Sequence, residues 1–380
     1  MSLGHIAWTV AGGAAVLLVV QWGYLVVVLV WEDQKTRGVA YYGLSLSERE
    51  RFKRALRLHA RLLSPFVRLL GRLSKPDLGR ASFRFEGVAG PKGTCSVETF
   101  RQATEYDPRP GDVFVATQMK CGTTWMQHLV YQILLRGQGD LAEIGQALYA
   151  VSPWLESIKS VSVADAPVVG TEHPSRIVKT HLPARLCPSS PEAKYIYVAR
   201  HPVSCFASCV DFLAGNMGPF CPSLDVIEEW FCSSEMMWWG TWPAHVQGWW
   251  DRSRGTKNTL FVRFEDMRSD LATVARRVAA FLDMAPLSDA ELDGVVTKCG
   301  FAYMQRHQSS FEMYPPHILA FDTKLFVRGT ADRHRDASQG AAERIMAWCV
   351  DELKDGTFPI KDMYPVVEPP SRQGLHLGAG

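Results

Sequence analysis

The sequence predicts an α/β fold in which helices flank a parallel β-sheet, and two observations lead to this prediction. The 380 residues are 47% hydrophobic and 21% charged, a composition that can bury a large core and is not typical of a disordered chain. From residue 112 onward, short β-rich runs alternate with helical stretches. This alternation favours a parallel sheet, because each parallel strand needs a long crossover to reach the next.

Four strands are expected, at 113–117, 176–180, 195–199 and 260–264. Helices are expected to begin near Thr123, Pro202, Ser269 and Ser288. Ser288 and Glu291 form a capping-box pattern at the last of these starts. Functional side chains in such folds lie at the carboxyl ends of the strands. We place the folded domain at 101–365 and a flexible tail at 366–380.

An apolar segment lies near the N-terminus. Residues 6–31 contain no charged side chain over 26 positions, and about 20 apolar residues are enough to span a bilayer core. Trp8, Trp22 and Trp31 lie partly near the ends of this segment, as membrane-interface aromatics do. We therefore expect a transmembrane anchor at 1–35, with a cleaved signal peptide or a buried core helix as the alternatives.

The charges that follow the segment predict its orientation. Lys35 and Arg37 come directly after it and no Lys or Arg precedes it, so the positive-inside rule places the remainder of a single-pass membrane protein in the cytoplasm. A Golgi enzyme would hold the same domain in the lumen. The nine cysteines are an odd number without paired metal-ligand spacing, which indicates reduced thiols and agrees with the cytoplasm.

A basic amphipathic helix and a linker are expected at 36–100. Residues 32–80 hold 12 Lys and Arg against 5 Asp and Glu, a net +7, so the rest of the chain carries about −5. This distribution argues against a nucleic-acid-binding protein, whose basic surface would belong to the folded domain. Ser47 and Glu50 form a capping-box pattern, and Pro65 predicts a kink. The apolar positions at helical spacing are Phe52, Leu56, Leu63, Phe66 or Val67, and Leu70.

Two alternatives are open for this helix: it lies on anionic lipid with its apolar stripe in the interface, or it packs on the folded domain. After Arg80, the succession of Gly87, Gly90, Pro91 and Gly93 predicts a linker or loop.

The stretch 112–125 predicts a strand, a tight turn at Gly122 and a helix that runs to about residue 135. This geometry directs free backbone amides and the positive helix end at an anion. Lys120 precedes the glycine, and the Gly-x-x-x-x-Gly-Lys-Ser/Thr pattern of Walker A is absent. We therefore expect a phosphate-type anion other than a γ-phosphate; the alternative is a plain connection with a surface lysine.

The stretch Gln-Met-Lys-Cys-Gly-Thr-Thr-Trp at 118–125 resembles the Tyr-Pro-Lys-Ser-Gly-Thr-Thr-Trp loop of the cytosolic-type sulfotransferases, which use 3′-phosphoadenosine 5′-phosphosulfate (PAPS). The resemblance implies that Lys120 contacts the 5′-phosphosulfate and its leaving oxygen and that Trp125 stacks on adenine. It also implies that residues Gly122, Thr123 and Thr124 supply backbone amides, and the two threonines hydroxyls, to the phosphosulfate loop.

Cys121 takes the place of the family's serine in this loop. A thiol beside Lys120 at a helix N-terminus is expected to have a lowered pKa and to react fast.

Lys-Thr-His-Leu-Pro at 179–183 resembles the family's catalytic strand end. The resemblance implies that His181 is the general base and that Lys179 steadies the sulfuryl group, whereas a lone His at a strand end is usually structural. It assigns Arg200 and Ser208 to the 3′-phosphate, which suits a planar guanidinium and a hydroxyl. The alternatives are that Arg200 forms a salt bridge with a carboxylate and that Ser208 only packs against its neighbours.

Three later stretches complete the resemblance with altered residues. Phe264 stands where the family's Tyr-Glu-Asp-Met strand end has tyrosine, so stacking is kept without a hydroxyl. Phe301 matches an adenine contact. Arg328 and Gly329 match part of Arg-Lys-Gly-x-x-Gly-Asp-Trp and are expected near the 3′-phosphate. The family's dimer motif is not legible at 335–343, so the oligomeric state is open.

The resemblance implies a P-loop-like sulfotransferase fold, and an enzyme that moves a sulfuryl group from PAPS to a hydroxyl or amine by in-line displacement. No metal is implied, and no cluster with metal-ligand spacing occurs in the sequence. Six tryptophans between 230 and 250 suggest core packing or a pocket for a hydrophobic small molecule or lipid. The alternatives are a membrane-tethered nucleotide-binding pseudoenzyme and a P-loop kinase.

Overall fold

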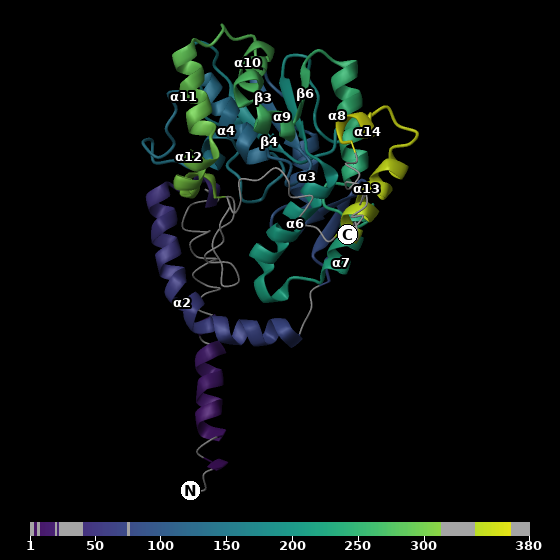
Figure 1. Cartoon of the computed structure of the whole chain (residues 1–380). Helices are drawn as coiled ribbons and strands as arrows, with labels where there is room; N and C mark the ends of the chain where they lie inside the picture. The colour runs from purple at the N-terminus through teal and green to yellow at the C-terminus, as the bar shows by residue number, and fades with distance from the viewer. Residues whose placement is uncertain are drawn as a thin grey trace, which may run out of the picture.

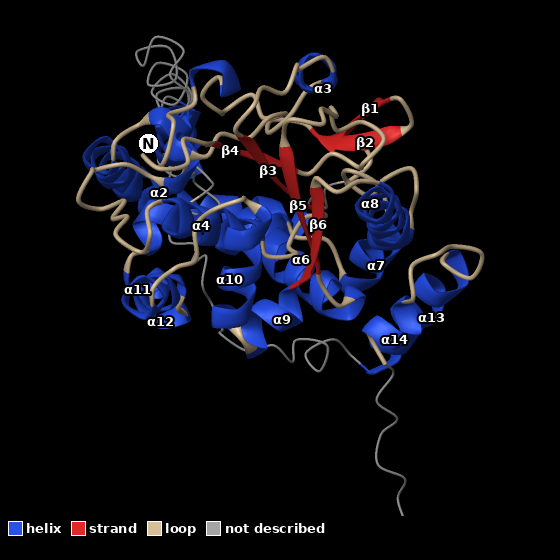
Figure 2. Ribbon diagram, turned by 90° about the horizontal axis from the view of Figure 1, so that it is seen from above, coloured by secondary structure: helices blue, strands red, loops and turns tan. Residues whose placement is uncertain are grey.

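The computed structural model describes residues 4–5, 8–19, 21–22, 41–73, 77–312 and 339–365. A parallel sheet of four strands, in the order β4-β3-β5-β6, forms the centre of the described chain (Figure 2). The strands are β3 (Asp112–Thr117), β4 (Arg176–Thr180), β5 (Lys194–Ala199) and β6 (Thr259–Arg263). Each of the four predicted strands is confirmed to within one residue. The parallel α/β fold class is therefore also confirmed.

Successive side chains of each strand point to opposite faces of the sheet, and both faces are hydrophobic. Helices therefore cover both faces and close two hydrophobic cores. Val113 and Val115 of β3 belong to one core, and Phe114 and Ala116 belong to the other. The first core is closed by α4 (Thr123–Leu134), α10 (Leu271–Phe281) and α11 (Asp289–Cys299). The second is closed by α6 (Pro202–Met217), α7 (Leu224–Cys232), α8 (Trp242–Gly255) and α13 (Gln339–Glu352).

Shorter elements connect these layers (Figure 1). The helices are α3 (Val97–Thr104), α5 (Leu148–Val151), α9 (Phe264–Ser269), α12 (Phe301–Arg306) and α14 (Ile360–Met363). The 3₁₀ turns are η1 (Tyr41–Gly43), η2 (Val163–Asp165), η3 (Gly218–Phe220) and η4 (Gln308–Phe311). The expected helix starts at Thr123 and Pro202 are confirmed, and the capping box of Ser288 with Glu291 is present at the start of α11.

The Gly- and Pro-rich stretch after Arg80, expected to be a linker or loop, instead contains an antiparallel hairpin of β1 (Ser82–Phe85) and β2 (Val88–Pro91). Its two-residue turn is Glu86 and Gly87, with φ of 45° and 77°. Positive φ at both turn residues matches the right-handed twist of paired strands. The hairpin is joined to the body, since the amide of Trp239 donates to the carbonyl of Ala89 at 2.7 Å.

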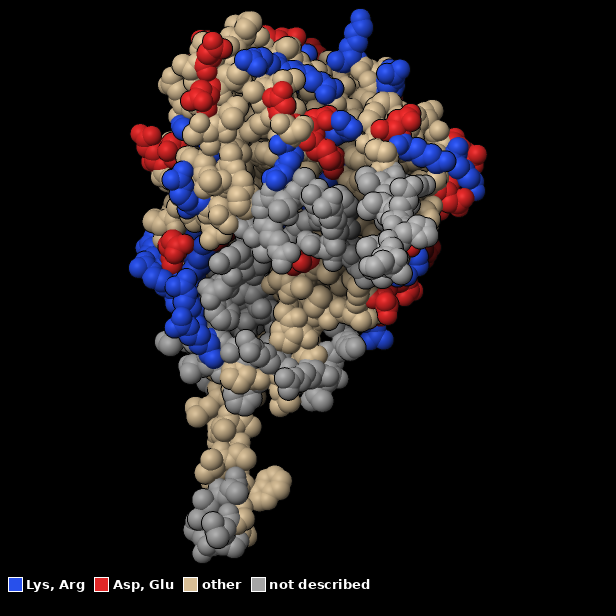
Figure 3. Space-filling view, viewed as in Figure 1, with Lys and Arg blue, Asp and Glu red and all other residues tan. Residues whose placement is uncertain are grey.

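The basic amphipathic helix is α2 (Leu46–Leu73), and it begins earlier than expected. Its cap uses Ser45 and Glu48, whose carboxylate accepts from the Ser45 amide at 2.9 Å, rather than Ser47 and Glu50. Pro65 lies inside the helix, which bends beneath the body (Figure 1), as expected where a proline removes a backbone donor. Lys and Arg side chains gather along α2 (Figure 3).

Contacts near both ends of α2 hold it against the body. Arg49 is 1% exposed and donates to the carbonyls of Tyr42 and Glu312, each at 3.0 Å. Near the other end, a Cβ placed on Gly71 would lie 2.4 Å from the Pro219 side chain, which shows how closely the helix approaches η3. These contacts support the expectation that the helix packs on the folded domain.

The predicted transmembrane anchor is not supported, and the prediction of a single-pass membrane protein is wrong on this finding. In the described part of the chain, no helix combines the length and the apolar character that a bilayer crossing needs. The apolar helical run at 8–19 spans 12 described residues, whereas α2 has 28 residues but carries many charges. Of the expected anchor at 1–35, positions 1–3, 6–7, 20 and 23–35 lie outside the described residues.

Candidate functional site

The turn that joins β3 to α4 forms the centre of the candidate site. Lys120 and Gly122 both have positive φ, 65° and 100°, and α4 begins immediately afterwards at Thr123. Gly122 is the N-cap residue and has no side chain to cap the helix. The first amides of an α-helix have no partner within the helix, so those of Thr123 and Thr124 can serve an anion at the positive helix end. The geometry of the turn therefore suits a phosphate-type anion.

An aromatic ring packs directly on this turn. A Cβ placed on Gly122 would lie 2.6 Å from the ring of Phe264, so no side chain fits there. The same ring lies edge-on to Trp125, with centroids 5.4 Å apart, and the guanidinium of Arg200 lies 4.4 Å from its centroid. The indole of Trp125 is oriented by a 2.9 Å hydrogen bond to the Cys299 carbonyl. Four parts of the sequence thus meet at the turn, namely 122–125, Arg200, Phe264 and Cys299.

Arg200 connects the end of β5 to the turn. Its side chain is buried, and Nη1 donates to the carbonyl of Lys120 at 2.9 Å. The ammonium of Lys120 lies 4.9 Å from the ring centroid of Phe212 on α6. Lys120 therefore lies against α6 and Arg200 lies against Phe264, and both place positive charge beside the turn.

The other predicted nucleotide contacts are less closely defined. Ser208 is buried on α6, in its second turn. Phe301 begins α12, two residues after the carbonyl that holds Trp125. Arg328 and Gly329 lie outside the described residues. The structure therefore brings the turn, Arg200 and Phe264 together, and gives only the element on which Ser208 and Phe301 lie.

The prediction of a lowered pKa for the Cys121 thiol is wrong. Cys121 is fully buried under α6, and burial raises its pKa well above the ordinary value for cysteine. The expectation considered the helix end and Lys120 but not the loss of hydration, which disfavours a buried thiolate.

His181 lies directly after β4 and is tied to the end of β3. Its Nδ1 is 2.8 Å from the carbonyl of Thr117 and 3.2 Å from the Thr117 hydroxyl, which itself is 2.6 Å from the hydroxyl of Thr123. A carbonyl oxygen only accepts, so Nδ1 carries the proton and donates. Nε2 is then the nitrogen with the lone pair, and the imidazole can act as a base there.

Burial lowers the pKa of His181 well below its usual value of 6.5, and the positive charge of Lys179 lowers it further. Burial also lowers the pKa of Lys179, which the carboxylate of Glu156 opposes. The Lys179 ammonium lies 3.3 Å from the ring centroid of Trp154. His181 is therefore neutral at neutral pH. The fully buried Lys179 lies two residues before it, at the end of β4.

Glu156 is a buried carboxylate that sequence reasoning missed. It accepts from the backbone amide of His181 at 2.8 Å and from the hydroxyl of Thr180 at 2.9 Å. The segment that carries it runs alongside β4, because the amide of Leu155 donates to the carbonyl of Lys179 at 2.8 Å. Nothing in the local sequence around Glu156 indicates this role, since the pairing of the two segments is a tertiary contact.

His245 on α8, held by Tyr197 on β5, also fixes the backbone of His181. Nε2 of His245 donates to the carbonyl of His181 at 2.9 Å, and Nδ1 of His245 accepts from the hydroxyl of Tyr197 at 2.9 Å. Burial lowers the pKa of His245 to about 4, so it stays neutral and keeps this tautomer at neutral pH.

Trp239 carries backbone strain beside the candidate base. Its φ is 61°, unusual for a bulky residue, and its ring lies 4.8 Å from that of His181. Gln118 holds this segment, because its side-chain amide donates to the carbonyls of Trp238 and Gly240. Gln118 therefore attaches the strained segment to the turn.

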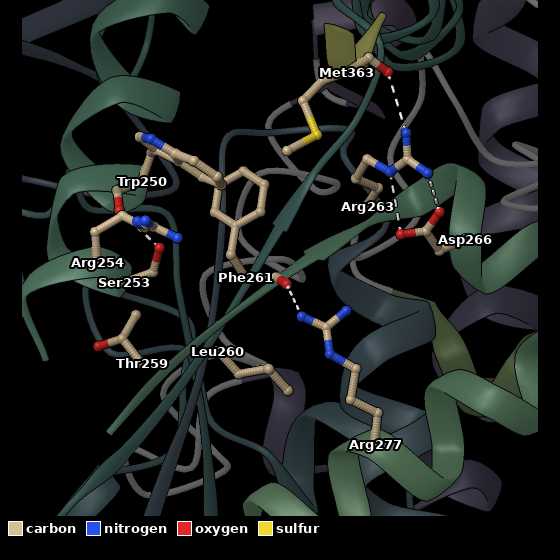
Figure 4. Close-up of a pocket in the computed structure, with 10 residues that line it drawn as sticks. All are labelled: Trp250, Ser253, Arg254, Thr259, Leu260, Phe261, Arg263, Asp266, Arg277 and Met363. Atoms are coloured by element: carbon tan, nitrogen blue, oxygen red, sulfur yellow. Dashed lines mark hydrogen bonds and ion pairs between the residues drawn. The ribbon is translucent and has the colours of Figure 1, made fainter. Parts of the chain in front are cut away.

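A pocket of about 360 Å³ lies along the edge strand β6 (Figure 4). Arg263 pairs there with Asp266 and donates to the carbonyl of Met363, and Arg277 donates to the carbonyl of Phe261. The pocket contains none of the predicted site residues. These arginines connect α9, α10 and α14 to the edge strand. In the described ranges, no group of His, Cys, Asp and Glu is arranged to hold a metal ion.

Comparisons with known proteins agree with the geometry. A family model described as "Sulfotransferase domain" matches residues 110–357. Human sulfotransferase 2B1 is 31% identical over 255 residues, which cover 65% of this chain and 67% of the human protein. Mouse sulfotransferase 1E1 is 28% identical over 260 residues, 67% of this chain and 87% of the mouse protein.

Solved structures share the fold at lower identity. Mouse sulfotransferase SULT7A1, complexed with PAP, matches with a TM-score of 0.55 and 20% identity over 72% of this chain and 96% of the mouse chain. Retinol dehydratase, in complex with retinol and PAP, matches with a TM-score of 0.57 and 20% identity over 74% of this chain and 94% of its own.

We predict that Gly122→Ala destabilises the protein more than Gly145→Ala. Both glycines have positive φ, which costs about 1–2 kcal/mol for an L-residue. Gly145 has open space around it, whereas the new methyl at Gly122 meets the ring of Phe264. Overpacking adds about 1–3 kcal/mol, so the unfolding free energy in urea should fall further for Gly122→Ala. Equal losses for the two variants would contradict the close packing of Phe264 on the turn.

Proposed function

Because the chain belongs to the sulfotransferase domain family, we propose that it transfers a sulfuryl group from PAPS to an acceptor hydroxyl or amine, with His181 as the general base. The observation that carries the proposal is the tautomer of His181. Its Nδ1 donates to the carbonyl at the end of β3, so Nε2 has a lone pair, one strand away from the anion-binding turn. A base and an anion site at adjacent strand ends suit group transfer to a hydroxyl.

The choice of donor is supported by the turn and by the structural neighbours. Unsatisfied amides at the start of α4, the absence of a Cβ at Gly122 and the charges of Lys120 and Arg200 together suit a phosphate ester. Trp125 and Phe264 offer aromatic surface beside the turn. The mouse sulfotransferase and retinol dehydratase structures contain PAP, the product that PAPS leaves after transfer.

In the proposed reaction, Nε2 of His181 accepts the proton of the acceptor while the acceptor oxygen or nitrogen attacks sulfur and the bond from sulfur to the phosphate oxygen breaks. Lys120 and Lys179 place positive charge where the sulfuryl and phosphate oxygens gain negative charge. Glu156, which accepts from the His181 amide, and His245, which donates to the His181 carbonyl, keep the strand end in position.

The acceptor proposed for this site is a hydrophobic small molecule. Trp154 and Trp239 are both buried and adjacent to each other, and their rings contact the imidazole at centroid distances of 5.1 Å and 4.8 Å. Aromatic walls favour an acceptor with an apolar body and one polar group. Retinol dehydratase, which shares the fold, has been solved with retinol and with androsterone. A phenol or a sterol is therefore the first acceptor class to test.

We predict that His181→Ala lowers kcat/KM for sulfuryl transfer by about 10²–10⁴-fold, the usual contribution of a general base. The assay follows ³⁵S transfer from labelled PAPS to a panel of phenols and sterols. His173→Ala, at a partly exposed histidine in the loop before β4, is the matched control and should retain activity. PAP binding measured on His181→Ala should remain within a few-fold of the wild-type value. Equal transfer by wild type and His181→Ala would refute the role of the base.

The pH profile provides an independent prediction. The base must be neutral to act, and burial and Lys179 lower the pKa of His181, so the acid limb of kcat/KM should lie below pH 6.5. Lys179→Met keeps a buried side chain but removes one positive charge. The pKa of His181 then rises and the acid limb moves to higher pH. A limb that stays in place, or that moves to lower pH, would contradict the electrostatic coupling, whatever the overall loss of rate.

A further inference from the structure

Two buried cysteines from distant parts of the sequence meet behind the anion-binding turn. Cys121 lies in the turn and Cys205 lies in the first turn of α6, and both are 0% exposed. Their sulfur atoms are 3.6 Å apart. Cys205 Sγ is also 3.3 Å from the carbonyl of Met119. The two sulfurs are therefore in contact, with one of them in the segment that is suited to an anion.

A third buried cysteine, Cys209, lies one helical turn further along α6. Burial raises the pKa of Cys121 and of Cys209. Burial also acts to raise the pKa of Cys205, but hydrogen bonds from the other two thiols outweigh it, and the positive charge of Arg200 adds to their effect. The net effect lowers the pKa of Cys205, and the thiolate is the nucleophilic form of cysteine.

We propose that Cys121 and Cys205 are a modification site, at which a peroxide forms a disulfide that weakens nucleotide binding by the adjacent turn. The proposed oxidant is hydrogen peroxide, which is close to water in size.

Hydrogen peroxide is the two-electron oxidant that disulfide formation requires. The thiolate of Cys205 attacks one peroxide oxygen, the O–O bond breaks, and a sulfenic acid and hydroxide form. Cys121 then attacks the sulfenic sulfur, the S–S bond forms, and the second oxygen leaves as hydroxide. The two protons from the thiols convert both hydroxides to water. Each sulfur loses one electron, and the peroxide gains the pair.

The effect on the turn follows from the bond length. An S–S bond of about 2.05 Å requires the sulfurs to approach each other by about 1.5 Å from their present 3.6 Å. Cys121 lies between Lys120 and Gly122, which both have positive φ, so the movement acts on the residues that set the direction of the amides. The Lys120 carbonyl that accepts from Arg200 belongs to the same segment. The effect on nucleotide binding rests on the proposed function, whereas disulfide formation does not.

The test treats the full chain with hydrogen peroxide, blocks remaining thiols by alkylation, digests without reduction and identifies cross-linked peptides by mass spectrometry. Residues 121–136 form one tryptic peptide that contains only Cys121. The expected product joins this peptide to the one that contains Cys205. Cys205→Ser should abolish the cross-link, and Cys209→Ser, the matched control one turn away, should retain it. Equilibrium dialysis of the oxidised protein should show PAP binding weaker by about tenfold or more, restored by dithiothreitol.

Absence of a cross-link to the 121–136 peptide, or a cross-link that requires Cys209 instead of Cys205, would overturn the site. A Cys121–Cys205 disulfide with unchanged PAP affinity would overturn its effect on the turn. If the reduced protein fails to bind PAP at all, the proposed nucleotide function is wrong, and the cross-link still decides whether the two cysteines form the disulfide.

Discussion

The backbone turn between β3 and α4 is the constraint on which the rest of the site depends. It needs positive φ at Lys120 and Gly122 and leaves no space for a Cβ at the glycine. These requirements bring the start of α4 to the carboxyl end of the central strand and allow Phe264 to pack on the turn. Phe264 in turn contacts Trp125 and Arg200. A less tight turn would separate these residues and weaken the case for an anion site.

The order of the strands determines which other residues reach the turn. β3 lies between β4 and β5, with Ala116 opposite Thr180 and Thr117 opposite Val198. His181 and Arg200, which follow these two partner strands directly, therefore lie on either side of the turn. Parallel strands with helices on both faces produce this arrangement generally. In this chain, hydrogen bonds with Thr117, Glu156 and His245 hold His181 at its strand end.

The features that sequence reasoning predicted well are local. The strands are short apolar runs of β-rich residues, and the starts at Thr123 and Pro202 carry their own turn chemistry, so their positions were predicted within one residue. The hairpin after Arg80 was missed because glycines were taken as a linker signal, although positive φ at Glu86 and Gly87 is also what a two-residue hairpin turn requires. At 6–31 the sequence led to the prediction of an element that is not supported. The apolar run was taken as a spanning helix, although composition alone does not define one.

The features that it missed depend on tertiary contacts. Gln118 reaches the backbone at Trp238 and Gly240, 120 and 122 residues away, and no local pattern predicts that contact or the strained φ of Trp239. The burial of Cys121 comes from packing by α6, which reverses the expected direction of its pKa shift. Conversely, the residues assigned by resemblance at the turn, at His181 and at Arg200 do meet in space. Of the remaining assignments, Ser208 and Phe301 are placed only by the helices that carry them, and Arg328 and Gly329 lie outside the described residues.

The measurement that tests the account most directly is isothermal titration of the purified chain with PAP and with ATP. A turn that suits a phosphate but lacks the Walker A pattern, beside the charges of Arg200 and Lys120, predicts saturable PAP binding at one site per chain and much weaker binding of ATP. Tight ATP binding without any PAP binding would contradict the account, because it would show that the turn serves a γ-phosphate.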